Sequence, residues 1–200
     1  ACQCGSADCP AAAQRHATAA TVIHVLAEQA TLDGRSDKPG YLPGFGILPA
    51  DSVRALATSA RLTPVAVPTG AAPDPGYRPS AATLEFLRWR DLTCRWPGCD
   101  RPAEKSDIDH TVPWPHGPTH PSNTKPYCRS HHLIKTFCAG WTDQQRPDGT
   151  IVLTAPTGHV YGTQPHGAAM FPALAQPTGE LHLPTAQQTP GPDRAAMMPR

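Results

Sequence analysis

The sequence has 200 residues, of which 25 are proline, seven cysteine and ten histidine. This proline content excludes a mostly helical bundle and predicts a small folded core with many linkers. Seventeen basic against 16 acidic residues give a formal net charge of +1, so any nucleic-acid site must be local, and the longest apolar stretch, eleven residues, excludes a transmembrane helix.

The first part of the chain, residues 1–79, is interpreted as the C-terminal part of an upstream domain followed by a linker. The sequence does not begin with methionine, which is typical of a processed chain or a fragment. β-branched residues at 21–27 predict a strand, and apolar residues at helical spacing predict a helix over 50–60. A second strand is predicted at 62–67, and it leads into the proline- and glycine-rich linker 68–79.

The second part, residues 80–172, is expected to form an α+β module. Ser80 is a favourable N-cap for a helix that ends near Asp91. Alternating side chains predict a strand over 107–112, and a second helix is predicted over 129–137. Further predictions are two strands at 150–153 and 159–161 and a disordered tail at 173–200, which is rich in proline, threonine and glutamine.

The seven cysteines do not form an obvious disulfide framework, because their number is odd and several lie next to histidines. This pattern favours metal sites in a reducing compartment and predicts a cytoplasmic location. Near the start, Cys2, Cys4 and Cys9 surround a glycine. They fit either a three-thiolate metal site or inert cysteines, and the second reading is favoured.

Two pairs of residues in the second part have the spacing of zinc ligands. Cys94 and Cys99 enclose four residues, and Cys128 and His131 enclose two. A structural zinc takes four sulfur or nitrogen ligands, and two tight turns supply them with little loss of chain entropy. Such a site contributes on the order of 10 kcal/mol to the folding of small zinc domains. We therefore predict a structural zinc bound by these four residues.

Other polar residues lie between and after these pairs. Asp109 and His110 are adjacent near the end of the predicted strand, Asn123 follows a proline-rich loop, and His132 lies in the predicted helix. His132 directly follows His131, so the two side chains leave the helix in different directions. The two histidines are therefore expected to serve different sites.

This ordered set resembles the HNH endonucleases of the His-Me finger, or ββα-metal, class. The resemblance rests on the pair Asp109 and His110, on Asn123, and on the helix sequence CRSHHLIK at 128–135. Three longer runs, RWRDLTCRWPGCDRP, DIDHTVPWPHGPTHPSN and GWTDQQRPDGT, are similar to the C-terminal part of actinobacterial 13E12 repeat family proteins. In those proteins an N-terminal domain of unknown function precedes the HNH module, and the likeness extends over residues 2–172.

The resemblance implies a zinc-stabilised ββα-metal fold and a metal-dependent enzyme that hydrolyses DNA phosphodiester bonds. His110 would be the general base that takes a proton from the attacking water. Asp109 and His132 would hold one catalytic divalent cation, which is Mg²⁺, Mn²⁺, Ni²⁺ or Zn²⁺. The catalytic residue Asn123 would either approach that cation or fix the loop that orients the base.

Arg129 and Lys135 are implied as phosphate-binding residues, and DNA binding is expected to be weak, salt-sensitive and largely nonspecific. One alternative is a catalytically inactive, zinc-stabilised nucleic-acid-binding or interaction module, such as the remnant of a mobile element, which would share every zinc ligand. Asn123 fits equally well the cap of a turn after Ser122. No pattern in the sequence indicates an oligomeric state.

Overall fold

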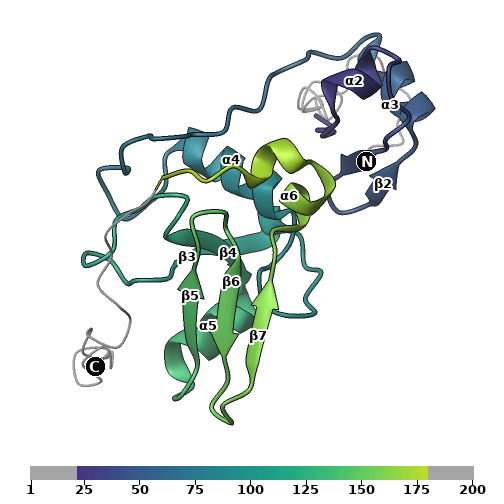
Figure 1. Cartoon of the computed structure of the whole chain (residues 1–200). Coiled ribbons are helices and arrows are strands. Elements are labelled where there is room, and N and C mark those ends of the chain that lie inside the picture. Colours follow the sequence, from purple (N-terminus) through teal and green to yellow (C-terminus); the bar gives the residue numbers. More distant parts are fainter. Residues whose placement is uncertain (1–21, 180–200) are drawn as a thin grey trace, which may run out of the picture.

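The computed structural model describes residues 22–179. Within this range the chain forms short helices and three small antiparallel sheets, a mixed α and β architecture (Figure 1). In Figure 1 the N-terminal elements lie at the upper right, helices α4 and α6 lie in the middle, and the strands of the second part lie below. The predicted cysteine cluster near the N-terminus lies outside the described residues, as do residues 180–200 of the predicted tail.

The N-terminal elements are two short helices and one hairpin: α2 (Gln29–Leu32), β1 (Gly40–Leu42), β2 (Gly46–Leu48) and α3 (Ala50–Ala57). The helix predicted over 50–60 is confirmed as α3. Its apolar spacing places Val53 against the hairpin, where a Cβ at Gly40 would lie 2.7 Å from the Val53 side chain. The glycine in β1 therefore allows α3 to pack closely.

The two strands predicted in this part were wrong. Among residues 22–27 only Leu26 pairs with a neighbour, in an isolated bridge to Tyr41. The side chains of Val22 and Ile23 are 69% and 66% exposed, so β-branched residues here lack the packed surface on which strand preference depends. The segment 62–67 is irregular, as expected where a proline removes a ladder hydrogen bond.

Helix α4 (Ala81–Asp91) is the helix predicted to follow Ser80, whose side chain accepts a hydrogen bond from the Thr83 N–H at 3.2 Å. Its buried end includes the charged Arg90 and Asp91. The Arg90 guanidinium donates to the Asp91 carboxylate at 2.8 Å and to the carbonyl of Thr124 at 3.0 Å. Helix α4 is thus tied to the strand that begins at Thr124.

The central hairpin consists of β3 (Ser106–His110) and β4 (Thr124–Cys128), which are antiparallel. A 3-10 turn, η1 (Ala103–Lys105), leads into β3, and α5 (Arg129–Phe137) follows β4 directly. The predicted helix over 129–137 is confirmed with its bounds. The strand predicted at 107–112 is shifted to 106–110, because the loop that follows is pinned to Asn123.

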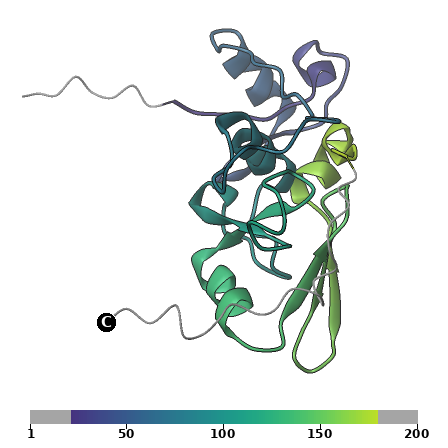
Figure 2. The same cartoon turned by 90° about the vertical axis from the view of Figure 1, so that its left-hand side faces the viewer.

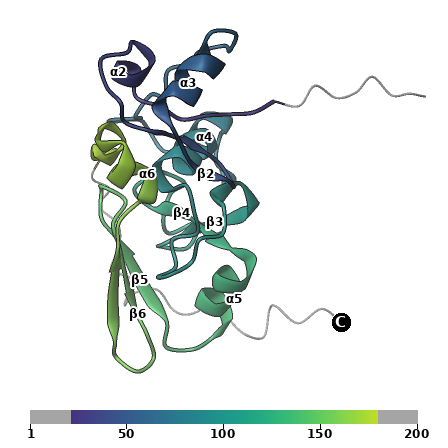
Figure 3. The ribbon, with the colours of Figure 1, turned by 90° about the vertical axis from the view of Figure 1, so that its right-hand side faces the viewer.

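A three-stranded sheet follows, with the order β5 (Thr142–Gln145), β6 (Ile151–Thr154) and β7 (Val160–Thr163). The predicted strands at 150–153 and 159–161 are confirmed as β6 and β7. The sequence of β5, TDQQ, is polar and gave no strand signal. Figures 2 and 3 show this sheet and α5 on different sides of the β3–β4 hairpin.

The C-terminal elements are α6 (His166–Met170) and the 3-10 turn η2 (Pro172–Ala175). Thr178 is buried, and its carbonyl accepts a hydrogen bond from the Gly70 N–H at 3.1 Å. Residues 173–179 are therefore ordered, in contrast to the predicted start of the tail. The residues at 173–179 are mostly small and carry no charge, so the sequence gave no sign that they pack against the fold.

The main core joins both ends of the described chain. Its buried members come from the N-terminal segment, α4 and the C-terminal elements: Leu26, Phe86, Trp89, Leu92, Ala168, Phe171 and Leu174. The predicted boundary at residue 79 therefore lies in a linker whose flanking parts share one core. No helix in the described part of the chain is long and apolar enough to span a membrane.

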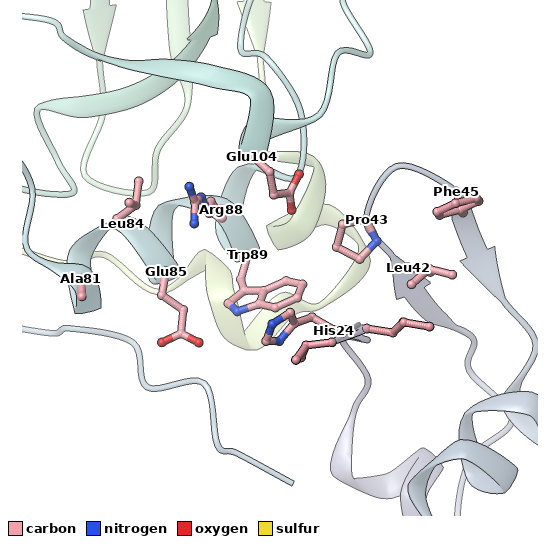
Figure 4. Close-up of a pocket in the computed structure, with 12 residues that line it drawn as sticks. His24, Leu42, Pro43, Phe45, Ala81, Leu84, Glu85, Arg88, Trp89 and Glu104 are labelled. Atoms are coloured by element: carbon pink, nitrogen blue, oxygen red, sulfur yellow. The ribbon is translucent and has the colours of Figure 1, made fainter. Parts of the chain in front are cut away.

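An apolar pocket of about 570 Å³ lies between the N-terminal segment and α4 (Figure 4). His24 and Trp89 line it in edge-to-face contact, with ring centroids 6.4 Å apart. Val22 and Ile23 also line it. None of the sequence-predicted site residues lines this pocket, so it is separate from the site described next.

Candidate functional site

The four predicted zinc ligands meet in the structure. The ligand atoms of Cys94, Cys99, Cys128 and His131 all lie within 4.8 Å of one another. His131 Nδ1 is 3.5 Å from Cys94 Sγ and 3.3 Å from Cys128 Sγ. A thiolate and an imidazole bound to one zinc at tetrahedral angles lie about 3.6 Å apart. The cluster therefore has the spacing of a metal site of the Cys₃His type.

Local geometry explains why these ligands converge. In the first turn Gly98 has a positive φ of 72°, and the Cys99 N–H donates to the Trp96 carbonyl at 3.0 Å. In the second turn the Cys128 N–H donates to Cys94 Sγ at 3.2 Å. Such N–H donors stabilise a thiolate. The turns are thus built to hold two ligands each.

The surroundings of the cluster are aromatic. Trp96 stacks on the His131 ring with centroids 4.7 Å apart, and Trp141 and Tyr127 pack against Trp96. Burial and the neighbouring cysteine thiolates raise the pKa of Cys94 to about 12. Three thiolates in this apolar shell therefore require a cation to stay ionised together, which is the condition that a bound zinc fulfils.

A second group of residues forms where β3 faces α5. His132 Nδ1 lies 2.9 Å from Asp107 Oδ2, and His132 Nε2 lies 3.5 Å from Asp109 Oδ1. Asp107 and Asp109 are two apart in β3, so both carboxylates face the helix. The hydrogen bond with His132 is the main cause that lowers the pKa of Asp107. The Asp107 carboxylate accepts a hydrogen bond from His132 Nδ1–H. In a neutral ring the lone pair then lies on Nε2, which is directed toward Asp109.

The distance between these two atoms suits a shared cation. An imidazole nitrogen and a carboxylate oxygen that each lie about 2.1 Å from one ion are about 3.4 Å apart at tetrahedral angles. The observed Nε2–Oδ1 separation is 3.5 Å. One nitrogen and one oxygen form a donor set that suits Zn²⁺, Ni²⁺ or Mn²⁺. Asp109 and His132 therefore fit the cation that the resemblance implies.

The other oxygen of Asp109 belongs to a buried ionic network. Lys125 Nζ lies 2.9 Å from Asp109 Oδ2 and 2.7 Å from Asp143 Oδ2, and Lys135 Nζ lies 2.6 Å from Asp109 Oδ2. Burial opposes ionisation of Asp109, but the charges of Lys125 and Lys135 outweigh it and lower the pKa of its carboxyl. Lys125, in β4, is fully buried.

His110 lies at the end of β3 and is only 6% exposed. Its Nε2 is 2.8 Å from Thr119 Oγ1, and the Tyr77 ring stacks on it with centroids 5.2 Å apart. Burial is the main cause that lowers the pKa of His110 to about 4, although the charge of Asp109 opposes it. The ring is therefore neutral at pH 7, the state that a general base requires.

Asn123 is fully buried and holds the loop after β3. Its Oδ1 accepts from the Val112 N–H at 2.9 Å, and its Nδ2 donates to the carbonyls of Val112 and Pro118 at 3.0 and 2.9 Å. A Cβ at Gly117 would lie 2.6 Å from this Nδ2, so the loop passes very close. Of the two roles left open by the sequence, these contacts are those of a loop-fixing residue.

The two predicted phosphate-binding residues differ in their surroundings. The Arg129 side chain is 72% exposed and lies 3.2 Å from Asp107 Oδ2. Lys135 is 13% exposed, and its Nζ donates to Asp109 and to the carbonyl of His110 at 2.6 Å. Arg129 is thus placed to reach a ligand in solvent, whereas Lys135 is engaged inside the site.

Sequence reasoning gave no role to several residues that contact the site. Asp107 carried a usable signal, because it lies two positions before Asp109 and so shares its strand face. Thr119 and Tyr77 carried none, since their contacts with His110 depend on how a linker and a loop fold back. His120, in the same loop as Thr119, is only 1% exposed.

Comparison with known proteins divides the chain differently from the predicted boundary at residue 79. Residues 1–91 match the family described as a domain of unknown function, DUF222. The DUF222 match extends through the end of α4, and so it includes the helix that carries Arg90. No solved structure matches the chain.

Two proteins of Mycobacterium tuberculosis are similar to this chain over all of its 200 residues. Uncharacterized protein Rv3776 of strain ATCC 25618 / H37Rv is 44% identical over 223 residues, which cover 100% of this chain and 43% of that protein. Uncharacterized protein Rv2100 of the same strain is 42% identical over 239 residues, which cover 100% of this chain and 44% of that protein. The chain thus spans less than half the length of these relatives.

Proposed function

We propose that the chain is a metal-dependent endonuclease that hydrolyses DNA phosphodiester bonds. The observation that carries the proposal is the approach of Asp109 and His132 where β3 faces α5, with His110 next to Asp109 at the end of β3 and a Cys/His cluster with zinc spacing nearby. Two antiparallel strands followed by a helix are the order that the ββα-metal class implies. The DUF222 match adds support, because a domain of unknown function precedes the HNH module in the 13E12 repeat family.

In this proposal His110 is the general base. Its neutral ring takes a proton from the water that attacks the phosphorus atom. Asp109 and His132 would hold the catalytic cation, which supplies positive charge against the scissile phosphate. Asp107 orients His132 through the hydrogen bond to Nδ1. Asn123 keeps the loop after His110 in place.

The Cys/His cluster has a structural role in this proposal. Its four protein ligands fill the tetrahedral positions of a zinc ion and leave none for a substrate. Cys128 is the last residue of β4 and His131 lies in the first turn of α5. Zinc bound there would fix the angle between the strand and the helix, and hence the distance between Asp109 and His132.

DNA is the proposed partner, bound weakly and with little sequence preference. A net charge of +1 gives no long-range attraction, so contacts must be made near the site. Arg129 is the exposed cation beside His132 and would contact a phosphate oxygen. Binding through so few phosphate contacts should weaken as salt is added.

A second candidate function is a zinc-stabilised nucleic-acid-binding module without turnover. The observation that favours it is the engagement of Asp109 Oδ2 with Lys125 and Lys135. Two ammonium groups already neutralise the carboxylate that the cation would use. Tyr77 also covers one face of His110. This candidate keeps the Cys/His cluster and predicts DNA binding with no cleavage.

Cleavage of supercoiled plasmid DNA tests the proposal. The purified chain should nick the plasmid when Mg²⁺, Mn²⁺ or Ni²⁺ is added, and chelation should stop the reaction. His110→Ala should lower the nicking rate by about 100-fold or more, the size expected for loss of a general base. His116→Ala is the matched control, because His116 is exposed in the same loop region, and it should cleave at the wild-type rate.

The outcomes separate the two candidates. Equal nicking by the wild type and His110→Ala would rule out His110 as the base. Binding of the plasmid in a mobility-shift assay, without nicking under any of the three metals, would favour the module without turnover.

A further inference from the structure

The hydroxyl of Thr119 makes three close contacts in the interior. Thr119 is fully buried, and its Oγ1 lies 2.8 Å from His110 Nε2. The same oxygen lies 2.7 Å from the carbonyl oxygen of Gly76 and 3.2 Å from that of Tyr77. The base is therefore linked through Thr119 to the linker that precedes α4.

Counting protons fixes the direction of these hydrogen bonds. A threonine hydroxyl has one proton to donate and two lone pairs to accept with. The carbonyls of Gly76 and Tyr77 only accept, so the Thr119 proton is directed to them. Oγ1 must then accept from His110, which places the proton of the neutral ring on Nε2. Among residues 22–179 this contact is the only hydrogen bond of the His110 ring, so the lone pair of Nδ1 is left open.

We propose that Thr119 is a positioning residue that holds His110 in the tautomer with Nδ1 as the proton acceptor. The inference rests on the proposed function in that it names the atom of His110 that takes the proton from water. Without Thr119, either ring nitrogen of a neutral histidine can carry the proton, and only one tautomer leaves the correct atom free.

The linker keeps this arrangement in place from outside the HNH-like segment. The Asp74 N–H donates to the Thr119 carbonyl at 2.8 Å, and the two residues form an isolated antiparallel bridge. Tyr77 stacks on the His110 ring with an angle of 20° between the ring planes. The acceptors for the Thr119 proton are therefore held at a fixed distance from the base.

Nitrogen NMR of the histidine rings tests the inference without any activity. In the zinc-loaded wild-type chain at pH 7, long-range ¹H–¹⁵N correlations of His110 should show the proton on Nε2. His110→Gln assigns the signals by their loss. Thr119→Val keeps the shape of the side chain and removes the hydroxyl, so both tautomers should appear, and Thr119→Ser should restore the single one. A proton on Nδ1 in the wild type would overturn the inference even if Thr119→Val does not fold.

Plasmid nicking gives the second readout. Thr119→Val should lower kcat by at least about tenfold while the KM for DNA stays within about twofold, because the base is misplaced and the DNA contacts are kept. Thr119→Ser should recover most of kcat. Unchanged tautomer and unchanged kcat in Thr119→Val would refute the positioning role. If no variant nicks DNA, the proposed function fails, but the tautomer measurement still decides what Thr119 does to His110.

Discussion

At the scale of single residues, neighbours in the sequence have separate tasks. His131 points its Nδ1 at the cysteines, whereas His132 lies between two carboxylates of β3. Cys138, at the end of α5, is exposed, whereas Cys99 belongs to the Cys/His cluster. Whether a cysteine or histidine here can bind a metal therefore depends on its contacts and not on its residue type alone.

Replacement of one cysteine should reveal the metal. Cys99→Ser should lower the bound zinc by one ion per chain relative to the wild type, because a serine hydroxyl stays protonated at pH 7 and is a poor zinc ligand. Loss of a site worth on the order of 10 kcal/mol should also unfold the hairpin region. Elemental analysis after dialysis and urea unfolding measure the two effects. Cys138→Ser is the control, and equal zinc content in both variants would contradict the assignment.

At the scale of elements, a buried ionic network holds two sheets and a helix together. Lys125 in β4 contacts Asp109 in β3 and Asp143 in β5, and Lys135 from α5 reaches both carboxylates. The Tyr127 hydroxyl also donates to Asp143 at 3.1 Å. The sheet that carries β5 is thus connected to the candidate site through buried charges.

Lys125→Met should destabilise the fold by about 3–5 kcal/mol, because it leaves buried carboxylates with too little positive charge. The double variant with Asp143→Leu should cost at least about 1 kcal/mol less than the sum of the single changes. Urea unfolding followed by tryptophan fluorescence measures these differences. Lys38→Met, which breaks an exposed pair with Glu28, should cost under about 1 kcal/mol. Strictly additive effects would show that Lys125 and Asp143 are not coupled.

Local signals in the sequence predicted the elements that carry their own pattern. Ser80 capped α4 as expected, and the ligand spacing identified all four members of the Cys/His cluster. The strand at 21–27 was wrong because strand preference needs a neighbour to pack on. The contacts of Tyr77 and Thr119 with His110 could not be predicted, since they depend on how the irregular linker before α4 and the loop after β3 fold back onto the ring.

At the scale of the whole molecule, α6 closes the core by resting on the end of α4. A Cβ added at Gly167 would lie 1.9 Å from the backbone oxygen of Trp89, so only glycine permits this approach. Phe171 and Leu174 then reach the core beside Trp89. The packing of α6 on α4 therefore depends on the absence of a side chain at Gly167.

Gly167→Ala should therefore displace α6 and cost about 2 kcal/mol or more, since backbone has to move to admit the methyl group. Gly162→Ala is a matched control in β7, because a Cβ there would meet nothing within 4 Å, and it should be neutral or slightly stabilising. Urea unfolding of the two variants gives the comparison. Equal stability of both would show that α6 does not rest on α4 as described.

The shared core has a consequence for how such a chain can change during evolution. Leu26, Phe86 and Trp89 lie within the DUF222 match, and Phe171 lies eighty positions after its end at Asp91. A gene fusion that replaced everything after Asp91 with another domain would remove α6 from α4, the helix on which it packs. The region matched by DUF222 and the one that follows it are therefore expected to be inherited as a pair and exchanged together, not as separate cassettes.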